Sequence, residues 1–425
     1  MTRKLVVCLA AITLLAVCPC LFAQNLTDAA QAVVGPSTAT GAVPGISPQA
    51  IHAVPSDLID DDSTNSGPSS IAGNPGGVPG VISVPNFTRS FTVGGTTFPF
   101  TMIGNDPSLG HKTEVPAKII AVSLQLLNAD GSVLATVPAG EFEQPVLNSP
   151  NFQRFHYENT GEPVQFADAV QRAEFFSTMD GNWHTNLNPA TVVDRLTITV
   201  PKFVTVISRG VAVKALNYQA GTLPDGHIFV LMLNLFFNQQ LGNIVNQEID
   251  AGNITTSDIN INLFPNTFLF SFNRANPLGR GACCTLGFHT YFTDLGTPEQ
   301  RWVTIYASWI SPGLFGGGFE DVTALSHEIS ESFNDPFVNN ITPVWQFPGE
   351  PGACQGNLET GDPVEVLAQG SFPVTLKKDG IPFTFHPQTE ALLQWFAQTV
   401  PSDAIHGAYS YPDLTALTAP ATLCK

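Results

Sequence analysis

The sequence has few charged residues, and positive charges are the scarcest among them. Charged residues make up 12% of the 425 positions, and 17 lysines and arginines stand against 35 aspartates and glutamates, for a formal net charge of −18. A chain this acidic repels the phosphates of nucleic acids and the anionic surfaces of membranes. We therefore expect no nucleic-acid partner.

The motifs of several large enzyme classes are also missing. The chain has no G-x-S-x-G elbow of serine hydrolases and no glycine fingerprint of dinucleotide-binding proteins. The glycine run at residues 316–318 is not followed by the Lys-Ser/Thr pair of a phosphate-binding loop. These absences argue against the most easily recognised acyl-transfer, hydride-transfer and phosphoryl-transfer sites.

Long apolar runs are scarce too. The run His227–Phe237 is too short to span a bilayer and predicts a buried strand or helix. The first 23 residues match a secretion signal, because Arg3 and Lys4 precede an apolar core at Leu5–Leu15 and a cleavage site is predicted after Ala23. An uncleaved membrane anchor is the alternative, but this apolar core is short for one. We expect a secreted, extracellular or periplasmic protein with no membrane span after signal removal.

Cysteine is sparse, and its positions matter for the compartment. Three of the seven cysteines lie in the signal, which leaves Cys283, Cys284, Cys354 and Cys424. An even number in an exported protein predicts two disulfides. A bond between the neighbours Cys283 and Cys284 would be strained, so we expect each of them to pair with Cys354 or Cys424. A cysteine-rich zinc site is a weaker alternative, because no C-x-x-C spacing occurs.

Glycine, proline and phenylalanine are abundant, with 36, 34 and 30 residues. This composition favours a loop-rich, β-rich extracellular protein of the α+β class. We predict four segments: a signal peptide at residues 1–23, a disordered Pro/Gly/Ser-rich segment at 24–85, a mainly β domain at 86–206, and a mixed α/β domain at 207–425.

Local residue patterns predict the regular elements of the last two segments. Alternating apolar residues and turn signals indicate strands, and helical spacing indicates helices. The sequence predicts a hairpin at Thr88–Met102, strands at Lys118–Leu127, Val133–Val137, Arg195–Val206 and Trp302–Ile310, paired strands at Asp258–Phe272, and helices at Phe166–Phe176 and Asp321–Pro336.

The last of these helices, with the sequence DVTALSHEISESFNDP, has the most informative pattern. Its apolar residues recur at helical spacing, which predicts an amphipathic helix with one buried stripe. His327 and Glu331 are four residues apart, so they lie one above the other on another face. With Glu328 they form H-E-x-x-E, a variant of the H-E-x-x-H zinc motif in which glutamate replaces the second histidine. An exposed helix with a histidine and glutamates for solubility is the alternative.

A second acidic cluster, Glu-Thr-Gly-Asp, follows about thirty residues downstream. A zinc site needs three protein ligands and a position for water. We expect His327, Glu331 and either Asp362 or Glu359 to be these ligands. Glu328 would act as the general base that takes a proton from metal-bound water. Because carboxylates weaken the Lewis acidity of the ion and are hard ligands, Mn²⁺ or Ca²⁺ are alternatives to Zn²⁺.

Several blocks of the chain resemble known families. Ser326–Glu331 followed by Asn334-Asp335-Pro336 resembles the S-H-E-x-x-E-x-x-(T/N)-(D/N)-P segment of secreted metallopeptidase-like proteins of bacteria and fungi. Over roughly Val211–Lys425 the chain is also similar to plant phosphate-induced, Exordium-like proteins. The resemblance implies a zincin-like fold for residues 207–425, with peptidase activity poorly defined. It also makes His289, in the block CTLGFHTYF, a candidate site residue, although a histidine packed between aromatic residues is the alternative.

Two classes of function agree with these observations. The first is a secreted metal-dependent hydrolase, foremost a zinc metallopeptidase-like protein that acts on a protein, peptide or cell-wall substrate. The second is a non-catalytic extracellular binding or cell-surface module with a structural metal. The first requires an open coordination position on the metal, whereas the second does not.

Overall fold

The computed structural model describes residues 80–157, 160–294, 298–315, 319–365, 367, 370–378 and 380–424. The predicted signal peptide and residues 24–79 of the segment after it lie outside these residues. Within the described part, Val81–Ile82 forms strand β1, which pairs with Glu299 and Gln300. Regular structure therefore begins before the boundary predicted at residue 86.

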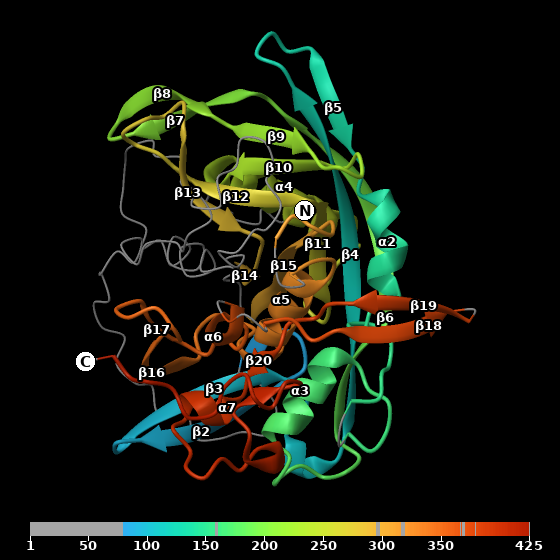
Figure 1. Ribbon diagram of the computed structural model, residues 1–425, viewed down its shortest axis with the longest axis vertical. Coiled ribbons are helices and arrows are strands. Elements are labelled where there is room, and N and C mark those ends of the chain that lie inside the picture. Colours follow the sequence, from blue (N-terminus) through green and yellow to red (C-terminus); the bar gives the residue numbers. More distant parts are fainter. Residues whose placement is uncertain are drawn as a thin grey trace.

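A mixed sheet of seven strands lies at the centre of the described residues (Figure 1). Its order is β1-β15-β11-β4-β5, with β14 beside β15 and β6 beside β4. The strands are β1, β4 (Lys112–Leu127), β5 (Val133–Val137), β6 (His184–Val200), β11 (Ile259–Pro265), β14 (Gly287–Asp294) and β15 (Glu299–Trp309). Strand β11 is parallel to β4 and to β15, whereas β14 is antiparallel to β15. One sheet thus contains strands of both the 86–206 and the 207–425 segments.

Smaller sheets and helices surround the central sheet (Figure 1). A four-stranded sheet contains β9 (Tyr218–Thr222), β10 (Ile228–Leu233), β12 (Thr267–Phe272) and β13 (Arg280–Thr285). The described residues also form two-stranded sheets: β2 (Asn86–Val93) with β3 (Thr96–Ile103), β7 (Phe203–Ser208) with β8 (Val211–Leu216), β16 (Ile341–Gln346) with β17 (Cys354–Asn357), β18 (Val374–Lys378) with β19 (Ile381–Phe385), and β20 (Glu390–Ala391) with β21 (Ser410–Tyr411). The α-helices are α2 (Gly140–Leu147), α3 (Phe166–Glu174), α4 (Asn234–Ala251), α5 (Thr323–Asn334), α6 (Asp362–Glu365) and α7 (Leu393–Phe396). Among the described residues, no helix combines the length and the apolar character needed to cross a bilayer.

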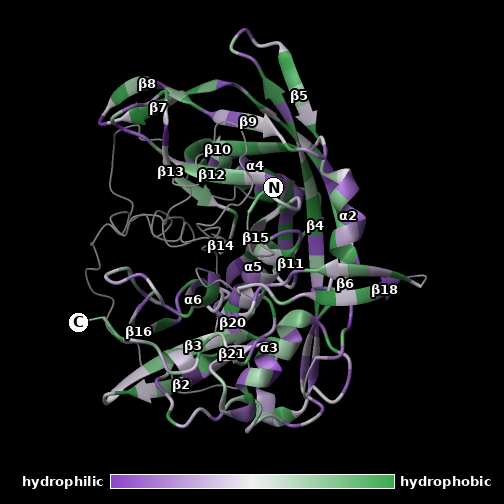
Figure 2. Cartoon of the chain, in the orientation of Figure 1, coloured by the Kyte–Doolittle hydropathy of each residue, from purple (hydrophilic) through white to green (hydrophobic). Residues whose placement is uncertain are grey.

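The central sheet is buried on both faces, as a sheet with parallel inner strands must be. Side chains alternate along β11, so Ile261 and Leu263 share a cluster with helix α5 whereas Phe264 packs with Phe237 of helix α4. The same alternation in β15 directs Ile305 toward α5 and Tyr306 toward α4. In Figure 2, strands β10 and β12 near α4 are coloured mainly as hydrophobic. Helix α5 is therefore fixed against one face of the sheet by an extensive apolar contact.

Most of the predicted elements are confirmed, but some of their partners are not. The mixed helix and strand composition is confirmed, with the hairpin β2–β3 and the helices α3 and α5 close to their predicted bounds. The prediction that Asp258–Phe272 forms paired strands is wrong. Its two strands lie in different sheets, because β11 pairs with β4 and β15 whereas β12 pairs with β10 and β13. The 18-residue helix α4 was not predicted.

The disulfide pairing also differs from the expectation. Cys283 is bonded to Cys284, and Cys354 is bonded to Cys424. The second bond follows from the strand arrangement, because the chain around residues 423 and 424 pairs with β16, which also pairs with the start of β17. The expectation that each of Cys283 and Cys284 bonds one of the two distant cysteines is therefore wrong, although the expected number of two disulfides is confirmed for the four cysteines that the structure describes.

Replacing Leu263 by alanine tests the role of the central sheet. Leu263 is 1% exposed between β4, β15 and α5, so we expect Leu263→Ala to lower the free energy of unfolding by about 2–5 kcal/mol through lost contacts and a residual cavity. Leu134→Ala is the matched control, because Leu134 is 51% exposed on β5 and should change stability by about 0.5 kcal/mol or less. Guanidinium unfolding followed by circular dichroism measures both, and equal losses would contradict this assignment of the core.

Candidate metal centre

Helix α5 is buried along its whole length. All twelve of its residues are buried, including the polar side chains of the H-E-x-x-E motif. The expectation that only one stripe of this helix is buried is therefore wrong, and so is the alternative of an exposed helix with solubilising charges. The polar face is covered by the loop at residues 359–362 and by the segment at residues 386–390, which both form hydrogen bonds with it.

The two ends of α5 are fixed by polar contacts. At the start, Asp321 accepts hydrogen bonds from the backbone N–H groups of Val322 and His386 through Oδ1, and its Oδ2 lies 2.7 Å from His386 Nδ1. Glu320, Asp321 and His386 form a group of three side chains that could hold a metal ion. Because the oxygens of Asp321 already have partners, we interpret the contact as a clamp between the helix and the segment at residues 386–390.

At the other end of α5, Asp335 forms a turn. Its carboxylate accepts hydrogen bonds from the backbone N–H groups of Asn339 and Asn340 at 2.9–3.1 Å, and Pro336 prevents the helix from continuing. Asp335 thus helps to end the helix and forms the turn that follows it. Burial raises the pKa of Asp335 to about 7, against the lowering effect of His289.

Three of the predicted metal ligands lie together. The Nε2 atom of His327 is 3.0 Å from Glu331 Oε1 and 3.5 Å from Asp362 Oδ1, and ligand atoms of all three residues lie within 4.8 Å of one another. Two ligand atoms that bind one zinc ion at about 2.0–2.2 Å in tetrahedral geometry are separated by roughly 3.4 Å. The spacing observed here is therefore close to that of atoms that share one ion. Metal binding itself stays a prediction.

Hydrogen bonds fix the orientation of the His327 ring. Its Nδ1 atom lies 3.1 Å from Oε1 of Gln388, and the amide nitrogen of that glutamine donates to the carbonyl of Gly361 at 2.6 Å. Because Oε1 can only accept, Nδ1 of His327 must carry the hydrogen. The lone pair is then on Nε2, which faces the two carboxylates. A hydrogen bond of this kind on the second ring nitrogen is the usual support of a metal-binding histidine.

Gly361 allows the downstream loop to approach the helix closely. A Cβ atom at this position would lie 2.2 Å from Nδ1 of His327. The N–H group of Gly361 donates to Oε1 of Glu331 at 3.1 Å, so the backbone itself contacts the motif. The absence of a side chain at Gly361 is therefore what allows this close contact.

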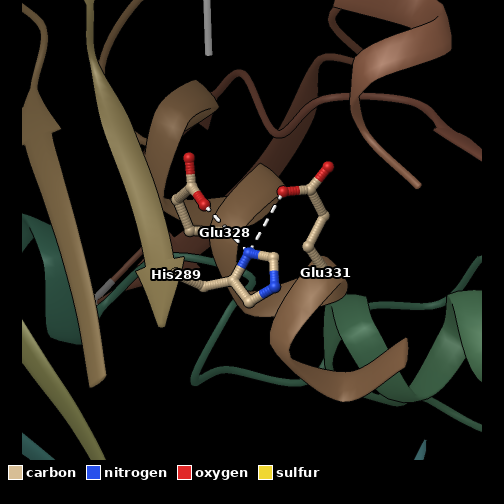
Figure 3. A group of neighbouring side chains, drawn as sticks. All are labelled: His289, Glu328 and Glu331. Atoms are coloured by element: carbon tan, nitrogen blue, oxygen red, sulfur yellow. Dashed lines mark ion pairs between the residues drawn. The ribbon is translucent and has the colours of Figure 1, made fainter. Parts of the chain in front are cut away.

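The second candidate for the third ligand lies elsewhere. Glu359 belongs to no group with His327, and its Oε2 atom is 3.7 Å from Nε2 of His289. His289 itself projects from β14, where it pairs with Ile305 in the sheet and so faces α5. Its Nδ1 atom is 3.4 Å from Glu331 Oε2 and 3.6 Å from Glu328 Oε2 (Figure 3). The residue that the family resemblance selected therefore lies beside the motif.

Two residues of the site carried no signal in the sequence. Gln388, which orients His327, and Glu390, on β20, are isolated polar residues outside any motif. Glu390 is fully buried, and burial raises the pKa of its carboxyl well above the usual range even though His327 lowers it. They reach helix α5 because the chain passes beside this helix again after β19.

The site is strongly acidic, and its side chains are shielded from solvent. Burial lowers the pKa of His327, but Glu331 and Glu328 outweigh this effect and raise it well above its usual value. Burial raises the pKa of Glu331, but His327 and His289 lower it to about 2. Burial raises the pKa of Asp362 and Glu359 well above the usual range. The ion pairs that the described residues form in this site involve only histidines as the basic partner.

Comparisons with protein-family models, with curated proteins and with solved structures found no match for this chain. The likeness to secreted metallopeptidase-like and Exordium-like proteins therefore rests on the quoted sequence blocks alone, and the zincin-like fold stays a prediction.

Gly361→Ala tests whether the close approach of the loop shapes the centre. The new methyl group would collide with the His327 ring, which must turn or shift, so we expect metal affinity to fall by about 10-fold to 100-fold. Gly356→Ala on the nearby strand β17 is the matched control, because its Cβ would meet only a methyl group of Val344 at an ordinary 3.7 Å. Calorimetric titration with Zn²⁺ measures both variants, and equal affinities would refute the role given to Gly361.

Proposed function

We propose that this protein is a secreted metal-dependent hydrolase whose metal is held by His327, Glu331 and Asp362. The observation that supports it most strongly is the Nε2 atom of His327, which is buried, has no hydrogen-bond partner and faces two carboxylates. A lone pair surrounded by acceptor oxygens is unfavourable unless a proton or a cation lies between them. A divalent cation satisfies all three groups at once.

The ligand set suits zinc, with Mn²⁺ and Ca²⁺ as alternatives. One imidazole and two carboxylates bind each of these ions, and a bound ion would supply Lewis acidity to a water molecule. Glu328 follows His327 directly, and no hydrogen bond reaches either of its oxygens. Burial raises the pKa of Glu328. A buried carboxylate with a raised pKa is suited to accept a proton from water, which is the role of a general base.

The compartment and the net charge of the chain indicate the substrate class. The predicted signal peptide and the disulfide between Cys354 and Cys424 favour an oxidising, extracellular compartment. A protein, peptide or cell-wall component is therefore the proposed substrate. The strongly acidic chain favours substrates without a high negative charge.

Burial of the site favours a second candidate, a non-catalytic extracellular module with a structural metal. The side chains of the six residues that form its histidine ion pairs are at most 4% exposed. Structural sites are closed in this way, whereas catalysis requires that a substrate reach the ion. The two candidates differ in activity, and both require a bound metal.

Two substitutions in the motif separate these candidates. We expect His327→Ala to lose the metal at this position and any hydrolysis with it. We expect Glu328→Gln to keep the ion at His327 but to lower hydrolysis by about 100-fold or more, because the proton acceptor is lost. Elemental analysis and a fluorogenic peptide-library assay with and without chelator measure these effects.

The controls are substitutions of the same types at exposed positions, His111→Ala and Glu141→Gln. A metal-bound wild-type protein that hydrolyses no substrate would support the structural module. A wild-type protein that binds none of the three ions would disprove both candidates.

A further inference from the structure

We infer that this centre holds two metal ions, one at His327 and one at His289, with the carboxylate of Glu331 as a bridge between them. The inference rests on the proposed metal binding and extends it to a second position. This second ion would be held by His289, Glu328 and Glu331, which form a separate group of three potential ligands.

The two histidines cannot share one ion in this arrangement. Among the described residues, each metal-ligand group of the motif contains one histidine, and only Glu331 belongs to both groups. Its two oxygens face different rings: Oε1 is 3.0 Å from His327 Nε2, and Oε2 is 3.4 Å from His289 Nδ1. A carboxylate with one oxygen directed to each side has the geometry that bridges ions about 3.5–4 Å apart in two-metal sites.

His289 is oriented in the same manner as His327. Its Nε2 atom lies 3.1 Å from the backbone carbonyl of Asp335, which can only accept, so Nε2 must carry the hydrogen. The lone pair is then on Nδ1, which faces one oxygen each of Glu328 and Glu331 (Figure 3). Each ring thus donates its single hydrogen to a carbonyl oxygen, that of the Gln388 side chain or that of the Asp335 backbone, and directs its lone pair at two carboxylates.

An ion at His327 alone would leave the carboxylate of Glu328, beside His289, without a hydrogen-bond partner or a bound ion. Glu328 is fully buried on α5, and neither of its oxygens accepts a hydrogen bond. Its Oε2 atom faces His289, whereas its Oε1 atom is directed toward Gly287 on β14. A second ion would bind Oε2 and leave Oε1 able to accept a proton. The proposed base function of Glu328 is therefore compatible with a role as a ligand through one oxygen.

Charge balance also favours two ions. Five carboxyl groups are buried together in this site, on residues Glu328, Glu331, Glu359, Asp362 and Glu390. Their ion pairs among the described residues are formed with the two histidines only. Buried charges require compensation by partners or metals. Two divalent ions balance the charge of four carboxylates. One ion balances only two, so most of the carboxyl groups would have to be protonated to stay neutral.

The test uses Mn²⁺, because two Mn²⁺ ions bridged by a carboxylate couple magnetically. The mature secreted chain is treated with chelator, dialysed and titrated with Mn²⁺, and the bound metal per chain is measured by elemental analysis. We expect two Mn²⁺ ions per chain and an electron paramagnetic resonance spectrum of an exchange-coupled pair. His289→Ala should bind one ion with an uncoupled spectrum, and Glu328→Gln should weaken the same position. His111→Ala, with a histidine at an exposed position, should bind two.

The outcomes distinguish this inference from the proposed function. One uncoupled Mn²⁺ per wild-type chain, lost in His327→Ala and kept in His289→Ala, would overturn the second position and leave the metal-dependent function standing. Failure of the wild-type chain to bind Mn²⁺, Zn²⁺ or Ca²⁺ would overturn both, and the histidines would then be protonated partners of the glutamates. The wild-type stoichiometry and spectrum decide the question even if a variant does not fold.

Discussion

The carboxylate of Glu331 is the group on which the arrangement of the site depends. It lies between two imidazole rings from different elements, one on its own helix and one on β14, and it also accepts the backbone N–H of Gly361. These contacts bring together the helix, the central sheet and the downstream loop. Because a buried carboxylate is costly without compensation, each of these elements must hold its position for Glu331 to stay ionised. Its pKa of about 2, lowered by the histidines against the effect of burial, expresses the same dependence.

The central sheet provides the rigidity that the site around Glu331 requires. Alternation along β11 and β15 places apolar side chains under α5 and aromatic side chains on the far face, so the helix is held by packing and not by its polar contacts alone. His289 lies at the edge of this apolar layer, opposite Ile305. The clamp between Asp321 and His386 then positions the segment that carries Gln388 against the helix. The apolar layers on both faces of the sheet thus hold in place the elements that surround a costly buried acidic site.

Local patterns predicted most strands, the helix α5 and three residues of its site, because periodicity and motif spacing are properties of short segments. They did not predict which strands pair, since β11 and β12 are adjacent in sequence but join different sheets. Helix α4 was missed because its many Asn and Gln residues obscure the apolar periodicity. Gln388 and Glu390 had no recognisable context, and His289 was selected only through a family resemblance. The burial of the polar face of α5 depends on segments far along the chain, so the amphipathic pattern alone suggested exposure.

A site with one histidine and two carboxylates per ion raises a chemical difficulty that the two-ion arrangement reduces. Carboxylates donate negative charge, so an ion that binds Glu331 and Asp362 alone is a weaker Lewis acid than one with three neutral ligands. If Glu331 bridges two ions, as we infer, its charge would be divided between them and each ion would retain more of its own. The position of Glu331 between two histidines would then give a physical reason for a glutamate where the zinc motif has histidine. An imidazole with one hydrogen-bonded nitrogen could serve only one of the two ions, whereas a carboxylate can serve both.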